Sequence, residues 1–231
     1  MLFMGKMKRV GDKGMEKSME QICEKEKDNR LMISLLAHIV EFRNGESATH
    51  IFHVQAITEM LLFRLLHKTD RYPLTASEVH RIVTASAMHD IGKISIPDKV
   101  LNKPGPLTEE EFDMMKRHTE IGAGILRDLS QQYSDELLDT AFRICRWHHE
   151  RYDGRGYPDG LRGEEIPIDA QVVSLADVYD ALVSERCYKK PFSHEDAMAM
   201  ILGGQCGAFN PLLLECLKEI SGELKRMVCG A

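Results

Sequence analysis

The residues best suited to chemistry lie in a few short segments, of which the most distinctive is RWHHERYDGRGYP, residues 146–158. Two adjacent histidines, His148 and His149, run directly into an acidic residue and a glycine-rich loop. Neutral imidazole is the commonest metal-binding side chain in proteins. The segment therefore predicts a metal site beside a sharply turning loop.

A second segment, IVTASAMHDIGK, places His89 and Asp90 where an apolar helix turns polar. A neighbouring imidazole and carboxylate can converge on one ion, and a carboxylate can also bridge two ions. Gly92 permits close approach of the backbone, and Lys93 lies on the same side of the helix as Asp90. Because a lysine is a poor metal ligand but a good phosphate partner, this segment predicts a metal site that faces an anion.

Further metal donors are spread over other predicted helices. His118 follows EEFDMMKR, and Glu46 and His50 are four residues apart, so they share one helical face. Asp177 lies in the apolar segment SLADVYDAL, where an unpaired carboxylate would cost on the order of several kcal/mol, and Asp180 lies one turn further on. Imidazoles and carboxylates on several separate helices indicate a multinuclear metal site.

The elements that must position these residues are predicted to be helices. The segment HIFHVQAITEMLLFRLLHK has amphipathic spacing, and capping boxes at Thr75 and Thr108 begin two more helices, the first running to about His89. Others are expected over roughly 134–149, 169–186, 194–202 and 210–228. The strand-like segments are too short for a sheet, so we predict an all-α fold with one long irregular loop, about residues 150–168.

Composition limits the class of protein. The chain has 231 residues, of which 43% are hydrophobic and 29% charged, as in an ordinary soluble domain. A net charge of −6 argues against broad nucleic-acid binding. We expect no membrane span and no secretory signal, and six cysteines without a C-x-x-C pair indicate reduced thiols and a cytoplasmic location.

Taken together, the motifs resemble those of the HD-GYP family, a branch of the HD phosphohydrolase superfamily. The resemblance covers about residues 44–215 and rests on His89-Asp90-x-Gly92-Lys93, IPDKVLNKPGPLTEEEF, His118, HHERYDGRGYPDGLRGEEIP and ADVYDALVSERCYKK. It implies an HD-type helical bundle with a long GYP loop, expected over residues 31–231, that hydrolyses cyclic di-GMP. Residues 1–30 are expected to be a charged helical leader or a signalling linker.

The resemblance also implies roles for individual residues. Asp90 would bridge two metals and, with Lys93, take part in catalysis. The implied metal ligands are His50, His89, Asp90, His118, His148, His149 and Asp177, with Glu46 matching a glutamate that lets some members hold a third metal. The residues expected to contact the substrate are Lys93, Tyr157, Asp180, Arg186 and Lys189.

The donor set suggests the cofactor and the reaction. Imidazoles and carboxylates without thiolates favour iron or manganese, and the count allows two divalent ions or three. Two ions would lower the pKa of a bridging water, whose hydroxide would attack phosphorus while Lys93 holds a non-bridging oxygen. The expected product is linear pGpG, and further cleavage to GMP stays open.

Other interpretations stay open. The substrate could be another cyclic dinucleotide or nucleotide, and a non-catalytic module that binds a diguanylate cyclase (GGDEF) domain is a third reading. An upstream sensory or receiver domain and a homodimer through the N-terminal helix are further partner hypotheses. The loop over 150–168 could approach a dinucleotide or only brace the two histidines. For His53 we favour orientation of a ligand, or packing, over direct metal binding.

Overall fold

The structure is a computed structural model that describes residues 31–43, 49–185 and 190–229. It divides into two compact units, residues 1–36 and 37–231, and the candidate site belongs to the second. The described part of the first unit, residues 31–36, is helical. The predicted leader over 1–30 lies outside the described residues, as do Glu46, Arg186 and Lys189.

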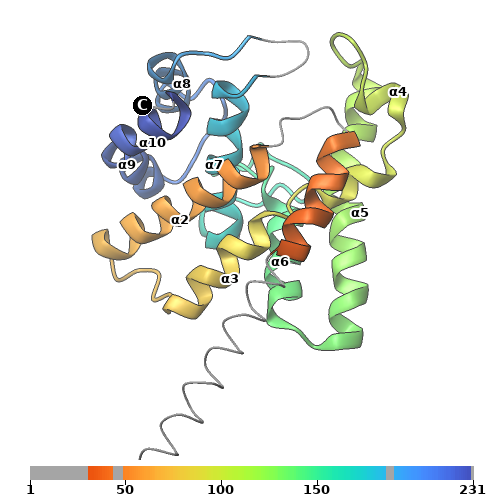
Figure 1. Ribbon diagram of the computed structural model, residues 1–231, viewed down its shortest axis with the longest axis horizontal. Coiled ribbons are helices and arrows are strands. Elements are labelled where there is room, and N and C mark those ends of the chain that lie inside the picture. Colours follow the sequence, from red (N-terminus) through yellow and green to blue (C-terminus); the bar gives the residue numbers. More distant parts are fainter. Residues whose placement is uncertain (1–30, 44–48, 186–189, 230–231) are drawn as a thin grey trace, which may run out of the picture. The chain divides into compact units, whose positions relative to one another are not determined.

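The described part of the second unit is helical, with an isolated bridge between Asp153 and Arg162 and no β-strand, which confirms the all-α prediction. After a helical segment over residues 37–43, the elements are α2 (His50–Lys68), α3 (Ala76–Ser86), η1 (Ile91–Ser95), α4 (Asp98–Leu101), α5 (Glu109–Tyr133), α6 (Glu136–Trp147), η2 (Gly163–Glu165), α7 (Ile168–Val183), α8 (His194–Leu202), α9 (Pro211–Glu219) and α10 (Ser221–Cys229) (Figure 1). None of these helices is both long enough and apolar enough to cross a membrane.

Helix α7 lies at the centre of this unit and packs against α2, α6 and α8 (Figure 1). Most of its residues are buried, which explains why its sequence is apolar nearly all round instead of striped. The main core gathers leucine, isoleucine and valine side chains from α2, α3, α6, α7 and α9, among them Leu61, Ile144, Leu175 and Leu213. A carboxylate on α7 therefore has to find a specific partner.

Local signals located most helix ends correctly. Thr75 and Thr108 each accept a hydrogen bond from the backbone of the glutamate three residues later, and both reciprocal bonds of the capping box form. Other boundaries differ from expectation. The helix expected to reach His89 ends at Ser86, because the chain tightens into three-residue turns there. The helix expected over 210–228 is divided near Ile220 into α9 and α10.

The loop after α6 is packed on its own first residues. The Glu150 carboxylate accepts hydrogen bonds from the backbone of Asp159 and Gly160, at 2.7 and 3.0 Å. A Cβ on Gly156 would lie 2.3 Å from backbone atoms of Glu150 and Arg151, so only glycine allows this crossing. The geometry at Gly156 agrees with a brace for the two histidines rather than with close approach to a ligand.

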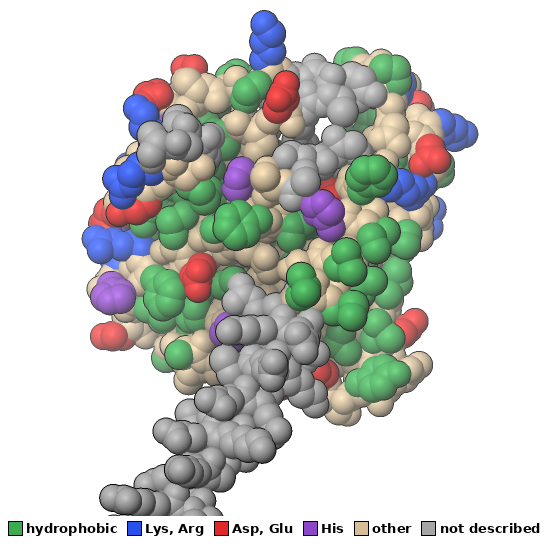
Figure 2. Space-filling view, in the orientation of Figure 1, with side chains coloured by type: hydrophobic (Ala, Val, Ile, Leu, Met, Phe, Trp, Pro, Cys, Tyr) green, Lys and Arg blue, Asp and Glu red, His purple; other side chains and the backbone are tan. Residues whose placement is uncertain are grey.

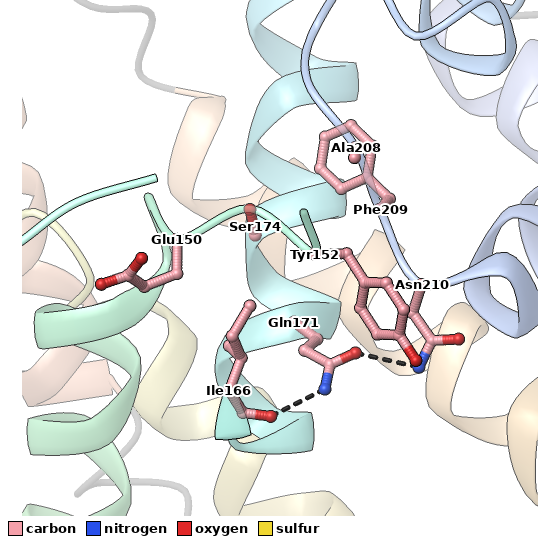
Figure 3. A pocket seen from close by; sticks show the side chains of 8 residues that line it. All are labelled: Glu150, Tyr152, Ile166, Gln171, Ser174, Ala208, Phe209 and Asn210. Carbon is pink, nitrogen blue, oxygen red and sulfur yellow. Dashed lines mark hydrogen bonds between the residues drawn. The ribbon is translucent and has the colours of Figure 1, made fainter. Parts of the chain in front are cut away.

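A narrow cavity behind the loop is lined by Glu150, Tyr152, Ile166, Gln171, Ser174, Ala208, Phe209 and Asn210 (Figure 3). Gln171 donates to the Ile166 carbonyl at 2.7 Å and accepts from Asn210 at 2.9 Å. The Asn210 side chain also accepts from the backbone N–H of Leu212 and so caps α9. Gln171 therefore ties the far end of the loop to α7, and Asn210 ties Gln171 to the start of α9, which is a structural role.

Replacing Gly156 by alanine is expected to lower the free energy of unfolding by about 1–3 kcal/mol, because the new Cβ would overlap the backbone. Gly124→Ala in α5 is the matched control, since its Cβ would meet no described atom within 4 Å. That variant should gain about 0.5–1 kcal/mol from its higher helix propensity. Urea unfolding measures both, and equal stabilities would contradict the crossing at Gly156.

Candidate metal centre

Seven of the eight predicted metal ligands lie among the described residues, on five different segments. His89 and Asp90 follow α3, and His118 lies in the middle of α5. His148 and His149 follow α6, His50 begins α2 and Asp177 lies on α7. Since these segments are far apart in sequence, only the packing of the bundle can bring the donors together.

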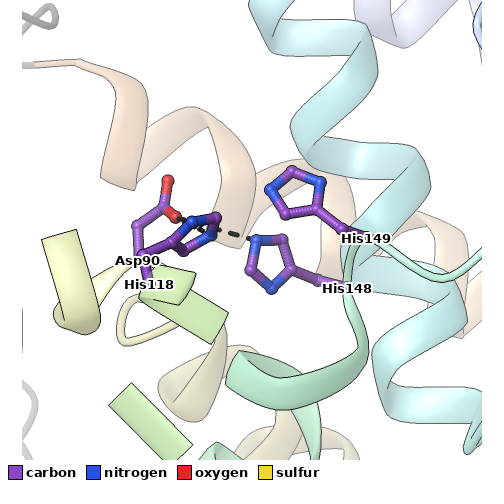
Figure 4. A group of neighbouring side chains, drawn as sticks. All are labelled: Asp90, His118, His148 and His149. Carbon is purple, nitrogen blue, oxygen red and sulfur yellow. Dashed lines mark ion pairs between the residues drawn. The ribbon is translucent and has the colours of Figure 1, made fainter. Parts of the chain in front are cut away.

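The first group of donors consists of Asp90, His118, His148 and His149, each offering an atom within 4.8 Å of the others (Figure 4). The Asp90 Oδ1 atom lies 3.1 Å from Nε2 of His118 and 3.7 Å from Nε2 of His148. Helices α5 and α6 pack along each other and so hold these histidines side by side. One carboxylate therefore faces three imidazoles.

The second group consists of Glu41, His50, His89 and Asp90, again within 4.8 Å of one another. The other oxygen of Asp90, Oδ2, lies 3.2 Å from Nε2 of His89. Asp177 approaches from α7, with Oδ1 3.8 Å from Nε2 of both His50 and His89. Because Asp90 belongs to both groups, the arrangement is consistent with a binuclear metal site in which Asp90 is shared.

Three of the histidines are oriented in the same way by the backbone. The Nδ1 atoms of His89, His118 and His148 donate to the carbonyl oxygens three residues earlier, at 2.9, 2.7 and 3.0 Å. A carbonyl can only accept a hydrogen bond, so the proton of each neutral ring must be on Nδ1. In that neutral form the lone pair on each Nε2 is available to a metal.

The residues present fit a metal because several of their buried polar atoms lack hydrogen-bond partners within the described part of the chain. The Nε2 atoms of His89, His118 and His148 are buried and make no hydrogen bond within the described part of the chain. The same holds for Oδ1 of Asp90. Each buried polar atom left in this way costs about 1–3 kcal/mol, and a cation coordinated by all of them would remove that cost.

The charges at the centre also favour a cation. Burial opposes the protonated form of His89, yet the negative charges of Asp90 and Asp177 outweigh it and raise the pKa of His89 to about 10. Burial raises the pKa of Asp90, but Lys93 and His89 more than compensate and hold it well below its ordinary value. The field that stabilises a proton on His89 equally favours a metal cation in its place.

At His148 and His149 the pKa shifts in the direction opposite to that of His89. Burial lowers the pKa of both His148 and His149, the latter well below its ordinary value, and the neighbouring imidazoles add to the effect. Both rings are therefore neutral near pH 7, which is the form that binds metals.

Asp180, predicted to contact the substrate, is bonded to two imidazoles behind the metal donors. Its carboxylate is buried and lies 2.7 Å from Nδ1 of both His50 and His53, and it accepts from Ser184 at 2.8 Å. An Nδ1–H bonded to a carboxylate directs the opposite nitrogen of His50 toward the metal centre. His53 is thus a second imidazole bonded to Asp180. This position agrees with the role of orienting a metal ligand, here through Asp180, which was one of the two roles favoured for His53.

Two residues expected to contact substrate lie beside the metal donors. The Lys93 Nζ atom is buried, 2.6 Å from Asp90 Oδ2 and 3.7 Å from Glu41 Oε2. Tyr157 stacks on the ring of His149, with centroids 4.8 Å apart at 27°. Tyr157 therefore caps a histidine of the centre directly.

Glu41 is the donor that the sequence patterns did not single out. It is 2% exposed and belongs to the second group of donors. The signal that could have found it is its position in the apolar segment LLAHIVEF, since a carboxylate there is as costly as Asp177 on its own helix. No short motif connects it to His50 or His89.

Comparison with known proteins gives a consistent result. A family model described as an HD domain matches residues 30–207. The chain is 36% identical to the cyclic di-GMP phosphodiesterase response regulator RpfG of Xanthomonas campestris. The match covers 92% of this chain and 52% of RpfG. The chain is 39% identical, over 80% of its length, to 33% of the 3'3'-cGAMP-specific phosphodiesterase 2 of Vibrio cholerae.

The fold also matches a crystal structure of a cyclic GMP-AMP-specific phosphodiesterase of V. cholerae, V-cGAP3. The TM-score is 0.62 at 18% identity, covering 86% of this chain and 50% of that one. The chain thus spans about half, or less, of the length of these relatives.

We expect Asp180→Ala to weaken metal binding about 10–100-fold, because His50 would lose the carboxylate that orients it. Titration of the metal-free protein with Mn²⁺ by calorimetry measures the affinity. Asp70→Asn, an exposed aspartate, is the control. An unchanged affinity in Asp180→Ala would show that His50 is held in place without Asp180.

Glu41→Gln removes one carboxylate from the second group of donors and is expected to weaken Mn²⁺ binding at least about tenfold, while binding at the first group persists. The metal content of the purified protein, measured by mass spectrometry, should fall by about one ion per chain. The matched control is Glu59→Gln on the exposed side of α2. Loss of all metal, or of none, would contradict this placement of Glu41.

Proposed function

The chain belongs to the HD domain family, in its HD-GYP branch, and on this premise we propose that it is a metal-dependent phosphodiesterase that hydrolyses cyclic di-GMP. The observation that supports the proposal best is the set of buried Nε2 atoms, without hydrogen bonds inside the described chain, around the shared carboxylate of Asp90. A binding module would not need to bury and orient so many imidazoles at one point.

The metal-binding residues would be His50, His89, Asp90, His118, His148, His149 and Asp177, joined by Glu41. When bound, two divalent ions lower the pKa of water and neutralise charge on a phosphodiester. The oxygen and imidazole donors, without thiolate, favour iron or manganese. Glu46, expected for a third ion, stays a proposal from the resemblance alone.

The protein's own residues would position the phosphodiester. Lys93 places a positive charge 2.6 Å from Asp90, beside the metal donors, so it would hold a non-bridging phosphate oxygen. Asp90 would fix the distance between the two donor groups, because each of its oxygens faces a different group. Tyr157 and the braced loop would keep His149 in one orientation and limit access of water.

Cyclic di-GMP is proposed first because relatives at 36–39% identity are named cyclic di-GMP phosphodiesterases. 3'3'-cGAMP is the second candidate, since a relative named for that substrate is equally similar, at 39% identity. Both substrates are cyclic dinucleotides with two phosphodiesters, and the metal centre would treat them alike. The choice between them must come from residues that contact the bases, for which Arg186 and Lys189 stay candidates.

The test is product analysis after anaerobic purification, with cyclic di-GMP, 3'3'-cGAMP and cyclic di-AMP supplied separately. We expect linear pGpG from cyclic di-GMP, and at least two metal ions per chain. Asp90→Asn should lose bound metal and at least about a thousandfold in kcat/KM, because both donor groups share Asp90. Asp70→Asn is the control, and turnover in a metal-free Asp90→Asn protein would refute the proposal.

A further inference from the structure

A line of aromatic rings leads outward from the metal centre. His149 contacts His118 within the first group of donors, with ring centroids 5.1 Å apart. Tyr157 stacks on His149, and Phe112 meets the Tyr157 ring edge to face at 6.3 Å. The far end of this line, Phe112, is on the surface, so the rings connect the metal donors to solvent.

Exposure alone does not distinguish Phe112. Hydrophobic side chains are visible at many points of the face shown in Figure 2, and Phe52 and Phe63 are 67% and 50% exposed. What distinguishes Phe112, at 47% exposed, is its contact with the ring that caps a metal-binding histidine. It also lies on α5 six residues before His118, which is about 9 Å along the helix.

A cation lies over the same ring. The Lys116 Nζ atom is 5.3 Å from the Phe112 centroid, and it pairs with Asp113 at 2.5 Å. Lys116 is one helical turn after Phe112, so the two side chains share a face of α5. This part of α5 thus presents a flat apolar ring, an ammonium group and a carboxylate together.

These groups match the chemistry of a guanine. Every nucleobase can stack on an aromatic ring, which contributes about 1–3 kcal/mol per base. A lysine can donate to O6 and N7 of guanine, whereas adenine presents an amino group in place of O6. An ammonium beside the stacking ring therefore favours guanine over adenine.

We propose that Phe112 and Lys116 form a base-binding shelf, on which one guanine of a cyclic dinucleotide stacks while its phosphodiester reaches the metal donors. This inference rests on the proposed function and goes beyond it, because it assigns guanine recognition to α5. Substrates with at least one guanine would use the shelf, and cyclic di-AMP would use it poorly.

The test measures kcat and KM of the metal-loaded enzyme for cyclic di-GMP. Phe112→Ala should raise KM about tenfold with a smaller effect on kcat, since stacking is present before the reaction begins. Phe112→Trp should restore the affinity, because any flat aromatic ring can stack. The control is Phe63→Ala, which removes an equally exposed ring on α2.

A second variant tests base selectivity. Lys116→Met keeps the length of the side chain and should reduce the preference for cyclic di-GMP over cyclic di-AMP about tenfold or more. An unchanged KM in Phe112→Ala would overturn the proposed shelf. A decrease in kcat and metal content without a change in KM would also overturn it, because it would show that Phe112 only supports Tyr157. If the wild-type enzyme binds metal but cleaves no cyclic dinucleotide, the proposed function fails as well, and these outcomes are distinct.

Discussion

The sharing of one buried carboxylate by two groups of imidazoles constrains the rest of this structure. Asp90 faces His118 with one oxygen and His89 with the other, and both imidazoles are buried with it. Their Nε2 atoms and Oδ1 of Asp90, buried without hydrogen bonds within the described residues, are unfavourable in a protein interior unless a cation joins them. The bundle must therefore be rigid enough to hold them together, and the extensive core around α7 provides that rigidity.

The ends of two helices orient the imidazoles of His89 and His148. In the last turns of α3 and α6, the carbonyl oxygens of Ser86 and Cys145 accept from the Nδ1 atoms of His89 and His148. The ring that satisfies the helix end thereby presents its other nitrogen to the centre. His118 achieves the same orientation within α5, and His50 uses the Asp180 carboxylate instead of a carbonyl.

The long loop packs directly against the metal centre. Glu150 follows the two histidines and collects the backbone N–H groups of Asp159 and Gly160, so the loop returns to the place where it began. That return brings Tyr157 onto His149. The glycine-rich loop is thus held by packing on itself. Its Tyr157 ring lines one side of the site and contacts Phe112.

The sequence by itself determined the helices and the kinds of donor, because both depend on local features. Capping boxes at Thr75 and Thr108 and the periodic apolar residues depend on neighbours a few positions away. The histidine and aspartate motifs likewise named most of the centre. Only the tertiary structure decided that Asp180 faces His50 and His53, and that Glu41 joins the donors. These contacts join segments that are distant in the chain, and their geometry follows from how whole helices pack, which no local pattern encodes.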